Sequence, residues 1–198
     1  HSGADYYQRF DEHANQVSDS TLFNSTASTT SQFTVGTSAL TNTSGHTYIA
    51  ILFADGSHGG AQIWGPSSNQ KMVDVGYYNG NGSSTGPIVN VGFEPTTLIL
   101  KGVAVTGGTA YWYIFDACKK FEAREEGTAW IEYNEYWYKL QGTGIIQQKA
   151  NGFQIRGTST SLNENGGVYL YVAFRGPMRV PNATYGDKPS HLFNCAYG

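Results

Sequence analysis

The chain has little charge, no excess of basic residues and no long apolar run. Only 14% of its 198 residues are charged, against about 25% in an average globular domain. The 12 Lys and Arg residues and 15 Asp and Glu residues give a net charge of −3. We therefore do not expect nucleic-acid binding, which needs an excess of cations to neutralise phosphates. No apolar run approaches the roughly 20 residues that cross a bilayer, so we expect no membrane insertion.

Cysteine is scarce, and no leader sequence is visible. Cys118 and Cys195 are the two cysteines, and their spacing alone does not decide whether they form a disulfide. Neither has a second cysteine or a histidine at the spacing of metal ligands. The chain opens at His1 without a basic and apolar leader. Because the chain begins with His and not with Met, and because residues 1–54 lack opening strands, we expect that His1 is not the natural translation start.

Glycine and aromatic residues are abundant, and their pattern is that of β-structure. The chain has 25 Gly and 14% aromatic residues, which argues against wholesale disorder. Apolar runs bounded by glycine-rich turns predict strands over residues 47–53, 87–91, 97–100, 111–115 and 168–174. This spacing predicts an all-β fold, an antiparallel β-sandwich of jelly-roll type. Gly80-Asn81-Gly82 is interpreted as a hairpin turn, and 117–126 is the one helix-like stretch.

Two parts of the chain resemble each other. Residues 5–11 resemble 110–116, and residues 36–53 resemble 157–174 at an offset of 121 (157 − 36). Within the second pair, Gly, Asn and an apolar run that begins with Tyr recur at matching positions. We interpret the two parts as related β units.

The earlier unit has no counterpart of residues 73–104, which supply the opening strands of the later unit. We therefore predict the C-terminal part of a first repeat over 1–54, a connector over 55–72, a complete second repeat over 73–176 and a C-terminal tail over 177–198. A β unit without its opening strands has unpaired backbone groups at its edges. We expect those strands to come from upstream, from another chain or from another part of this one.

The later unit carries an ordered set of short motifs. They are Val75-Gly76-Tyr77-Tyr78-Asn79-Gly80-Asn81-Gly82, Val91-Gly92-Phe93-Glu94-Pro95, Tyr113-Ile114-Phe115-Asp116, Asn151-Gly152-Phe153-Gln154-Ile155, Asn163 with Gly166 and Tyr169, and Arg175-Gly176-Pro177. In this order they resemble a β-rich repeat domain of tailed-bacteriophage virion proteins, of the tail, fibre and adhesin type in marine phages. The resemblance covers 73–181 and part of 5–54. It implies a β-rich fold and a place in the virion, and it carries over no catalytic residue.

Some residue types in the chain are ones that can catalyse reactions or hold metals. Asp11-Glu12-His13 offers three potential ligands, but only the aspartate recurs in the later unit, as Asp116, which favours a turn acceptor. Five glutamates between residues 122 and 135 are interleaved with Lys and Arg, a pattern typical of a solvated surface. We predict no catalytic residue, no metal site and no cofactor.

An aromatic cluster is the strongest binding candidate, and it lies in a stretch that the earlier unit lacks. Its members are Trp130, Tyr133, Tyr136, Trp137 and Tyr138. Such rings suit core cover, a subunit interface and a sugar ring alike. We predict that this stretch contacts a neighbouring subunit or a host ligand, with Trp130 and Trp137 as anchors.

These observations predict a non-enzymatic structural protein of a phage virion, in a tail, fibre or spike. The expected partners are copies of the chain, neighbouring virion proteins and, in one alternative, a host surface glycan. In that alternative the protein is a carbohydrate-binding adhesin module that uses the aromatic cluster at 130–138. A second alternative is a capsid decoration or head-fibre protein.

Overall fold

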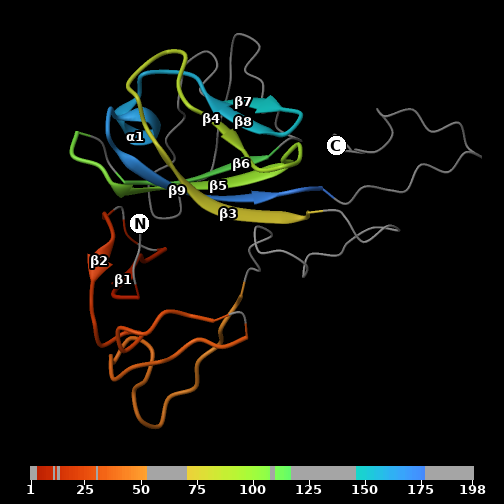
Figure 1. Ribbon diagram of the computed structural model, residues 1–198. Coiled ribbons are helices and arrows are strands. Elements are labelled where there is room, and N and C mark those ends of the chain that lie inside the picture. The colour runs from red at the N-terminus through yellow and green to blue at the C-terminus, as the bar shows by residue number, and fades with distance from the viewer. Residues whose placement is uncertain are drawn as a thin grey trace, which may run out of the picture.

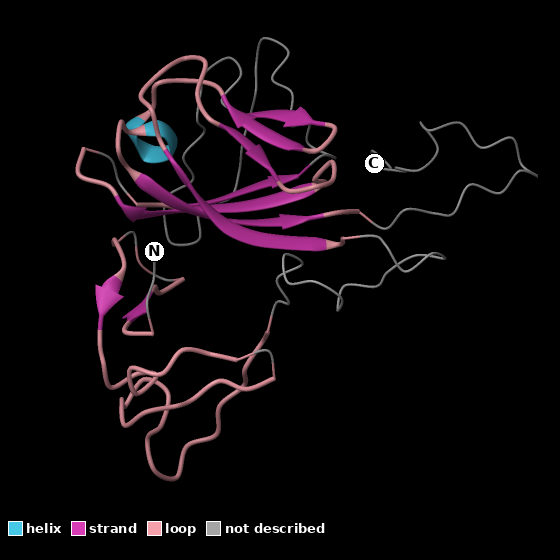
Figure 2. Cartoon of the chain, in the orientation of Figure 1, coloured by secondary structure: helices cyan, strands magenta, loops and turns pink. Residues whose placement is uncertain are grey.

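The computed structural model of the protein describes residues 4–10, 12, 14–29, 31–52, 71–107, 110–116 and 146–176. Strands dominate, and the one helix of the described part is the short α1 (Thr160–Asn163). All strand pairs are antiparallel. Figures 1 and 2 show the two larger sheets one above the other, with the small pair of strands near the N-terminus below them.

The larger sheet has four strands in the order β3 (Val73–Asn79), β9 (Val168–Phe174), β5 (Thr97–Ala104) and β6 (Trp112–Asp116). The predicted strands at 97–100, 111–115 and 168–174 are confirmed, with β5 running four residues further. The smaller sheet contains β4 (Ile88–Asn90), β8 (Gly152–Ile155) and β7 (Ile146–Lys149) in that order. Its first strand confirms the one predicted at 87–91, whereas the helix-like stretch 117–126 lies outside the described residues.

One apolar core joins the two sheets. Alternation along β9 turns Tyr169, Tyr171 and Ala173 to the same side, where all three are buried. The core also includes Tyr78, Leu98, Leu100 and Phe115 of the larger sheet and Val89, Ile146, Phe153 and Ile155 of the smaller one. Aromatic rings make contacts between the sheets, with the Phe153 ring edge-on to that of Tyr171 at 5.6 Å.

Asn163 fixes the connection between the sheets. It is 1% exposed, and its Nδ2 donates to the carbonyls of Ser83 and Gly157 at 2.8 and 2.7 Å. Its Oδ1 accepts from the Asn81 amide at 2.8 Å. The prediction of a hairpin turn at 80–82 is wrong, because β3 and β4 belong to different sheets. Residues 80–82 instead belong to a connection that leads from one sheet to the other, and the buried side-chain amide of Asn163 holds this connection in place.

Two loops share two equivalent hydrogen bonds. We call residues 36–48 the first loop and residues 157–169 the second loop. Asn42 Nδ2 donates to the Gly36 carbonyl at 2.7 Å, as Asn163 Nδ2 does to Gly157. The Tyr48 hydroxyl accepts from the Thr43 amide at 2.8 Å. The amide of Glu164 donates to the hydroxyl of Tyr169 at the same distance. Each partner lies 121 residues (169 − 48) from its counterpart.

Backbone geometry agrees with this correspondence. Gly45 and Gly166 occupy the same place in the two loops, with φ of 79° and 80°. That region costs residues with a Cβ atom but not glycine, which explains why glycine stands at both positions. The sequence similarity at this offset therefore corresponds to a shared local structure.

Beyond the loops the two parts differ, and the strand predicted at 47–53 is wrong. Residues 47–52 lie in no strand of the described part, and Phe53 lies outside it. Ile49, Ile51 and Leu52 are 92%, 76% and 74% exposed. After the second loop, β9 lies between β3 and β5. Both partners come from residues 73–104, which have no counterpart in the earlier unit, so the earlier run has no sheet to join.

Candidate functional site

The outer face of the larger sheet is covered by the N-terminal segment, which we define as residues 4–18. Within it, β1 (Tyr6–Tyr7) pairs with β2 (Val17–Ser18). Figure 1 shows this pair on the opposite side of the sheet from β4, β7 and β8. Strand alternation places Lys101 and Val103 of β5 on this outer face, while Leu98 and Leu100 point to the core.

The segment is tied to the end of β5 by hydrogen bonds. The Gln16 amide donates to the Val103 carbonyl at 3.0 Å, and Gln8 Nε2 donates to the Gly102 carbonyl at 3.3 Å. Asn15 binds Val105 twice, donating from Nδ2 at 2.9 Å and accepting at Oδ1 at 3.2 Å. These bonds fix the side chains of the segment relative to the sheet.

Lys101 is the most unusual residue under this cover. Its side chain is 0% exposed. The ammonium donates to the carbonyls of Glu12, at 3.0 Å, and Ala110, and it lies 5.3 Å from the centre of the Trp112 ring. Burial lowers the pKa of Lys101 to about 8, against the opposing effect of the Glu12 charge. A buried ammonium held by two carbonyls and a ring is a structural cation, because its donors are already engaged.

Trp112 forms the other side of this covered region. Its Nε1 donates to the Arg9 carbonyl at 2.9 Å. The Phe10 ring stacks on it with centroids 4.2 Å apart and planes 9° from parallel. Residues on both sides of the interface therefore hold the N-terminal segment against β6.

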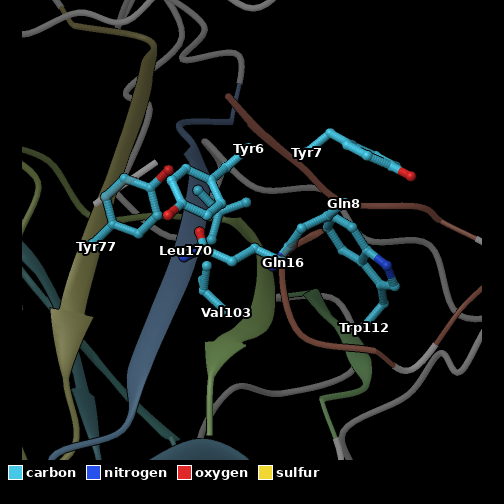
Figure 3. Close-up of a pocket in the computed structure, with 8 residues that line it drawn as sticks. All are labelled: Tyr6, Tyr7, Gln8, Gln16, Tyr77, Val103, Trp112 and Leu170. Atoms are coloured by element: carbon cyan, nitrogen blue, oxygen red, sulfur yellow. The ribbon is translucent and has the colours of Figure 1, made fainter. Parts of the chain in front are cut away.

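A cavity of about 240 Å³ lies between the N-terminal segment and the outer face. Figure 3 shows its lining, which comes from both sides: Tyr6, Tyr7, Gln8 and Gln16 from the segment, and Tyr77, Val103, Trp112 and Leu170 from the sheet. Tyr6 and Tyr77 are 38% and 39% exposed, so these two rings reach the surface. None of the described residues that line it carries a charge.

Two amide oxygens in this lining lack hydrogen-bond partners. Oε1 of Gln8 and Oε1 of Gln16 are buried and accept no hydrogen bond within the described part of the chain. The orientation of the Gln8 amide is set by its Nε2, which donates to Gly102. A buried acceptor left unpaired costs about 1–3 kcal/mol, so such a group needs an explanation.

The cavity and the buried lysine together make the candidate site, and the sequence predicted neither. The predicted cluster of Trp130, Tyr133, Tyr136, Trp137 and Tyr138 lies outside the described residues, and so do the glutamates at 122–135, Cys118 and Cys195. Of the potential ligands Asp11, Glu12 and His13, only Glu12 is described, and it forms an ion pair with Arg9. Lysine inside the apolar run of β5 was a signal that this face is covered, but nothing in the sequence placed residues 6–16 over it.

Among the described residues, no three His, Cys, Asp or Glu side chains gather closely enough to hold a metal ion. No helix among them is both long and apolar enough to span a bilayer.

Comparison with known proteins identifies the family of the chain. The model of a family described as Domain of unknown function (DUF7483) matches residues 2–176, and the chain therefore belongs to that family. The match takes in the N-terminal segment together with both sheets and ends two residues after β9. No curated protein and no solved structure matches the chain.

Proposed function

We propose that this member of the DUF7483 family is a non-enzymatic structural component of a tailed-phage virion, in a tail, fibre or spike. Its partners are copies of itself and neighbouring virion proteins. The order of motifs from residue 75 to 177 supports a place in the virion. The described lining of the cavity offers amides, phenol rings and alkyl groups and no carboxylate, imidazole or ammonium, which supports binding rather than catalysis.

We further propose that the fold is a jelly-roll-like β-sandwich with one partial and one complete repeat. The core that joins the two sheets supports the sandwich. The equal hydrogen bonds of the first and second loops support the repeat. In this proposal, residues 1–54 end with an incomplete copy of the unit that residues 73–176 form in full.

One observation carries the assembly role, and it is the exposed run at residues 48–52. Ile49, Ile51 and Leu52 are the most exposed of the exposed large apolar residues. The corresponding residues of β9 pair with strands on both sides. A run with the sequence of a central strand and no sheet around it is suited to pairing with strands of another molecule. Contiguous exposed apolar side chains mark interaction sites for the same reason.

Mass spectrometry of purified phage particles that encode the chain tests its place in the virion. Peptides from residues 73–176 are expected in amounts comparable to those of established virion proteins. Their absence from washed particles, with abundant chain in the infected-cell extract, would overturn the proposal. Partial removal of tails by shear then distinguishes a tail, fibre or spike component from a capsid decoration or head-fibre protein.

A carbohydrate-binding adhesin that uses Trp130 to Tyr138 stays the second prediction from the sequence. Aromatic rings and a hydroxyl-rich glycan are chemically matched. These residues lie outside the described part of the chain, so the prediction rests on composition.

A further inference from the structure

We propose that the exposed run at residues 48–52 pairs with the far edge of β3 in a second copy of the chain. We define the far edge as the side of β3 that is turned away from β9. The run then becomes a fifth strand of the neighbour's larger sheet. This pairing rests on the proposed assembly role, and it adds the acceptor strand and the mode of assembly to that role.

The far edge of β3 pairs with no strand of the described part of the chain. β3 stands first in the order β3-β9-β5-β6, so β9 takes only one of its sides (Figure 1). The Met72 carbonyl and the Gly80 amide, just outside its two ends, both form hydrogen bonds on the β9 side. Backbone groups alternate along a strand, so the N–H and C=O of Val73 and Val75 point to the far edge. There they bond no other described residue.

The far edge also lacks the features that usually keep a further strand away. Proteins guard sheet edges with short strands, proline and charged side chains. β3 spans seven residues, whereas the other edge strands of the two larger sheets, β6, β4 and β7, span five, three and four. It contains no proline, and its one charged residue, Asp74, is buried and bound to Lys71 and Tyr171. A further strand can therefore pair with it.

The exposed run at 48–52 has the sequence of the strand that β3 already accepts. It corresponds to part of β9, which pairs antiparallel with β3 over all seven residues. Ile49 and Ile51 point to the same side of an extended strand. Val73 and Val75 lie on one face of β3 and are half-buried. Pairing covers these four β-branched side chains together, and no charged group is buried with them.

The two surfaces differ, so the contact between copies is heterologous. A closed two-fold dimer needs a surface that pairs with its own copy. Here the run of one copy meets β3 of the next, which leaves a run at one end of the pair and a far edge at the other. Further copies therefore add at both ends, and such contacts form rings or open chains.

Sedimentation velocity on mixtures of two variants of the full chain tests this pairing. The run variant carries Ile49→Lys and Ile51→Lys and keeps the far edge of β3. The edge variant, Val75→Pro, loses an N–H at the far edge and keeps the hydrogen bonds of β3 to β9. We expect the wild type to form oligomers that grow with concentration. Each variant alone should stay monomeric, and their equimolar mixture should form a heterodimer that grows no further.

Two further variants serve as controls for the edge variant. Val75→Thr keeps the outward N–H and the branched side chain, so we expect it to assemble like the wild type. Val73→Pro takes the place of Val75→Pro if the Tm of the latter falls, because the first residue of a strand tolerates proline. With the Tm maintained, we expect either proline variant to weaken self-association about tenfold or more.

Three results would overturn the pairing. An edge variant that still associates by itself shows that the runs pair with each other or that another surface is used. A mixture that stays monomeric, while the wild type forms oligomers, shows that the run and the far edge do not meet. A wild type that is monomeric at every concentration shows no pairing at all. Mass spectrometry of particles tests the place in the virion separately, so either claim can fail while the other stands.

Discussion

At the scale of single residues, the burial of Lys101 depends on the N-terminal segment that covers the outer face of the larger sheet. Its side chain is buried between β5 and the N-terminal segment, and its ammonium binds the Glu12 carbonyl of that segment. The resulting pKa of about 8 lies below the 10.5 of an unperturbed lysine. Between these two values the unfolded chain binds more protons than the folded chain, so stability must rise with pH.

We therefore predict that the free energy of unfolding rises by about 2 kcal/mol from pH 8 to pH 10, and that Lys101→Met lacks this rise. Above pH 10 the direction reverses in both proteins. Burial raises the pKa of Tyr169 to about 12 and that of Tyr78 well above its usual value, so just above pH 10 these two side chains ionise mainly in the unfolded chain. Urea titrations at several pH values measure the slope. A wild-type profile that is flat or falls from pH 8 to pH 10 contradicts the burial of the ammonium.

At the scale of elements, Asn163 and Asn42 make an equivalent hydrogen bond in two loops, one buried and one exposed. Both donate from Nδ2 to the carbonyl of a glycine six residues earlier. Asn163 makes two further side-chain bonds, to Ser83 and Asn81, and thereby holds the connection from β3 to β4. Asn42 is exposed, so water replaces its bond at little cost.

Asn163→Ala should therefore lower the free energy of unfolding by about 3 kcal/mol, since it removes the three hydrogen bonds of a buried amide side chain. The matched change Asn42→Ala should cost less than about 1 kcal/mol. Thermal or urea unfolding of the two variants checks the difference. Equal losses would show that the crossing between the sheets does not depend on the buried amide.

Local sequence patterns predicted the elements that their own neighbours stabilise. The alternating run 168–174 and the run at 97–100 became β9 and β5, because residues 73–116 supply partners for both. The run at 47–53 has an equally strong pattern but no partners, so propensity alone did not make it a strand. The cavity was not predictable, because Gln8 and Gln16 become neighbours of Tyr77 and Trp112 only through tertiary contacts.

At the scale of the whole molecule, a packed core between two sheets stands beside an exposed apolar run at residues 48–52 that joins no sheet of the described part. The core uses residues 73–116 and 146–173. The first loop has the geometry of the second loop, and the run after it stays in solvent. We propose that other copies of the chain cover residues 48–52 when the protein assembles.

Sedimentation velocity of the full chain over a range of concentrations tests this claim most directly. The measurement compares the wild type with the double variant Ile49→Lys and Ile51→Lys, and with Ile88→Lys, which changes another exposed isoleucine on β4. We expect that the wild type and Ile88→Lys self-associate, while the double variant stays monomeric with an unchanged Tm. A wild type that is monomeric at every concentration, or a double variant that associates as strongly as the wild type, would contradict the claim.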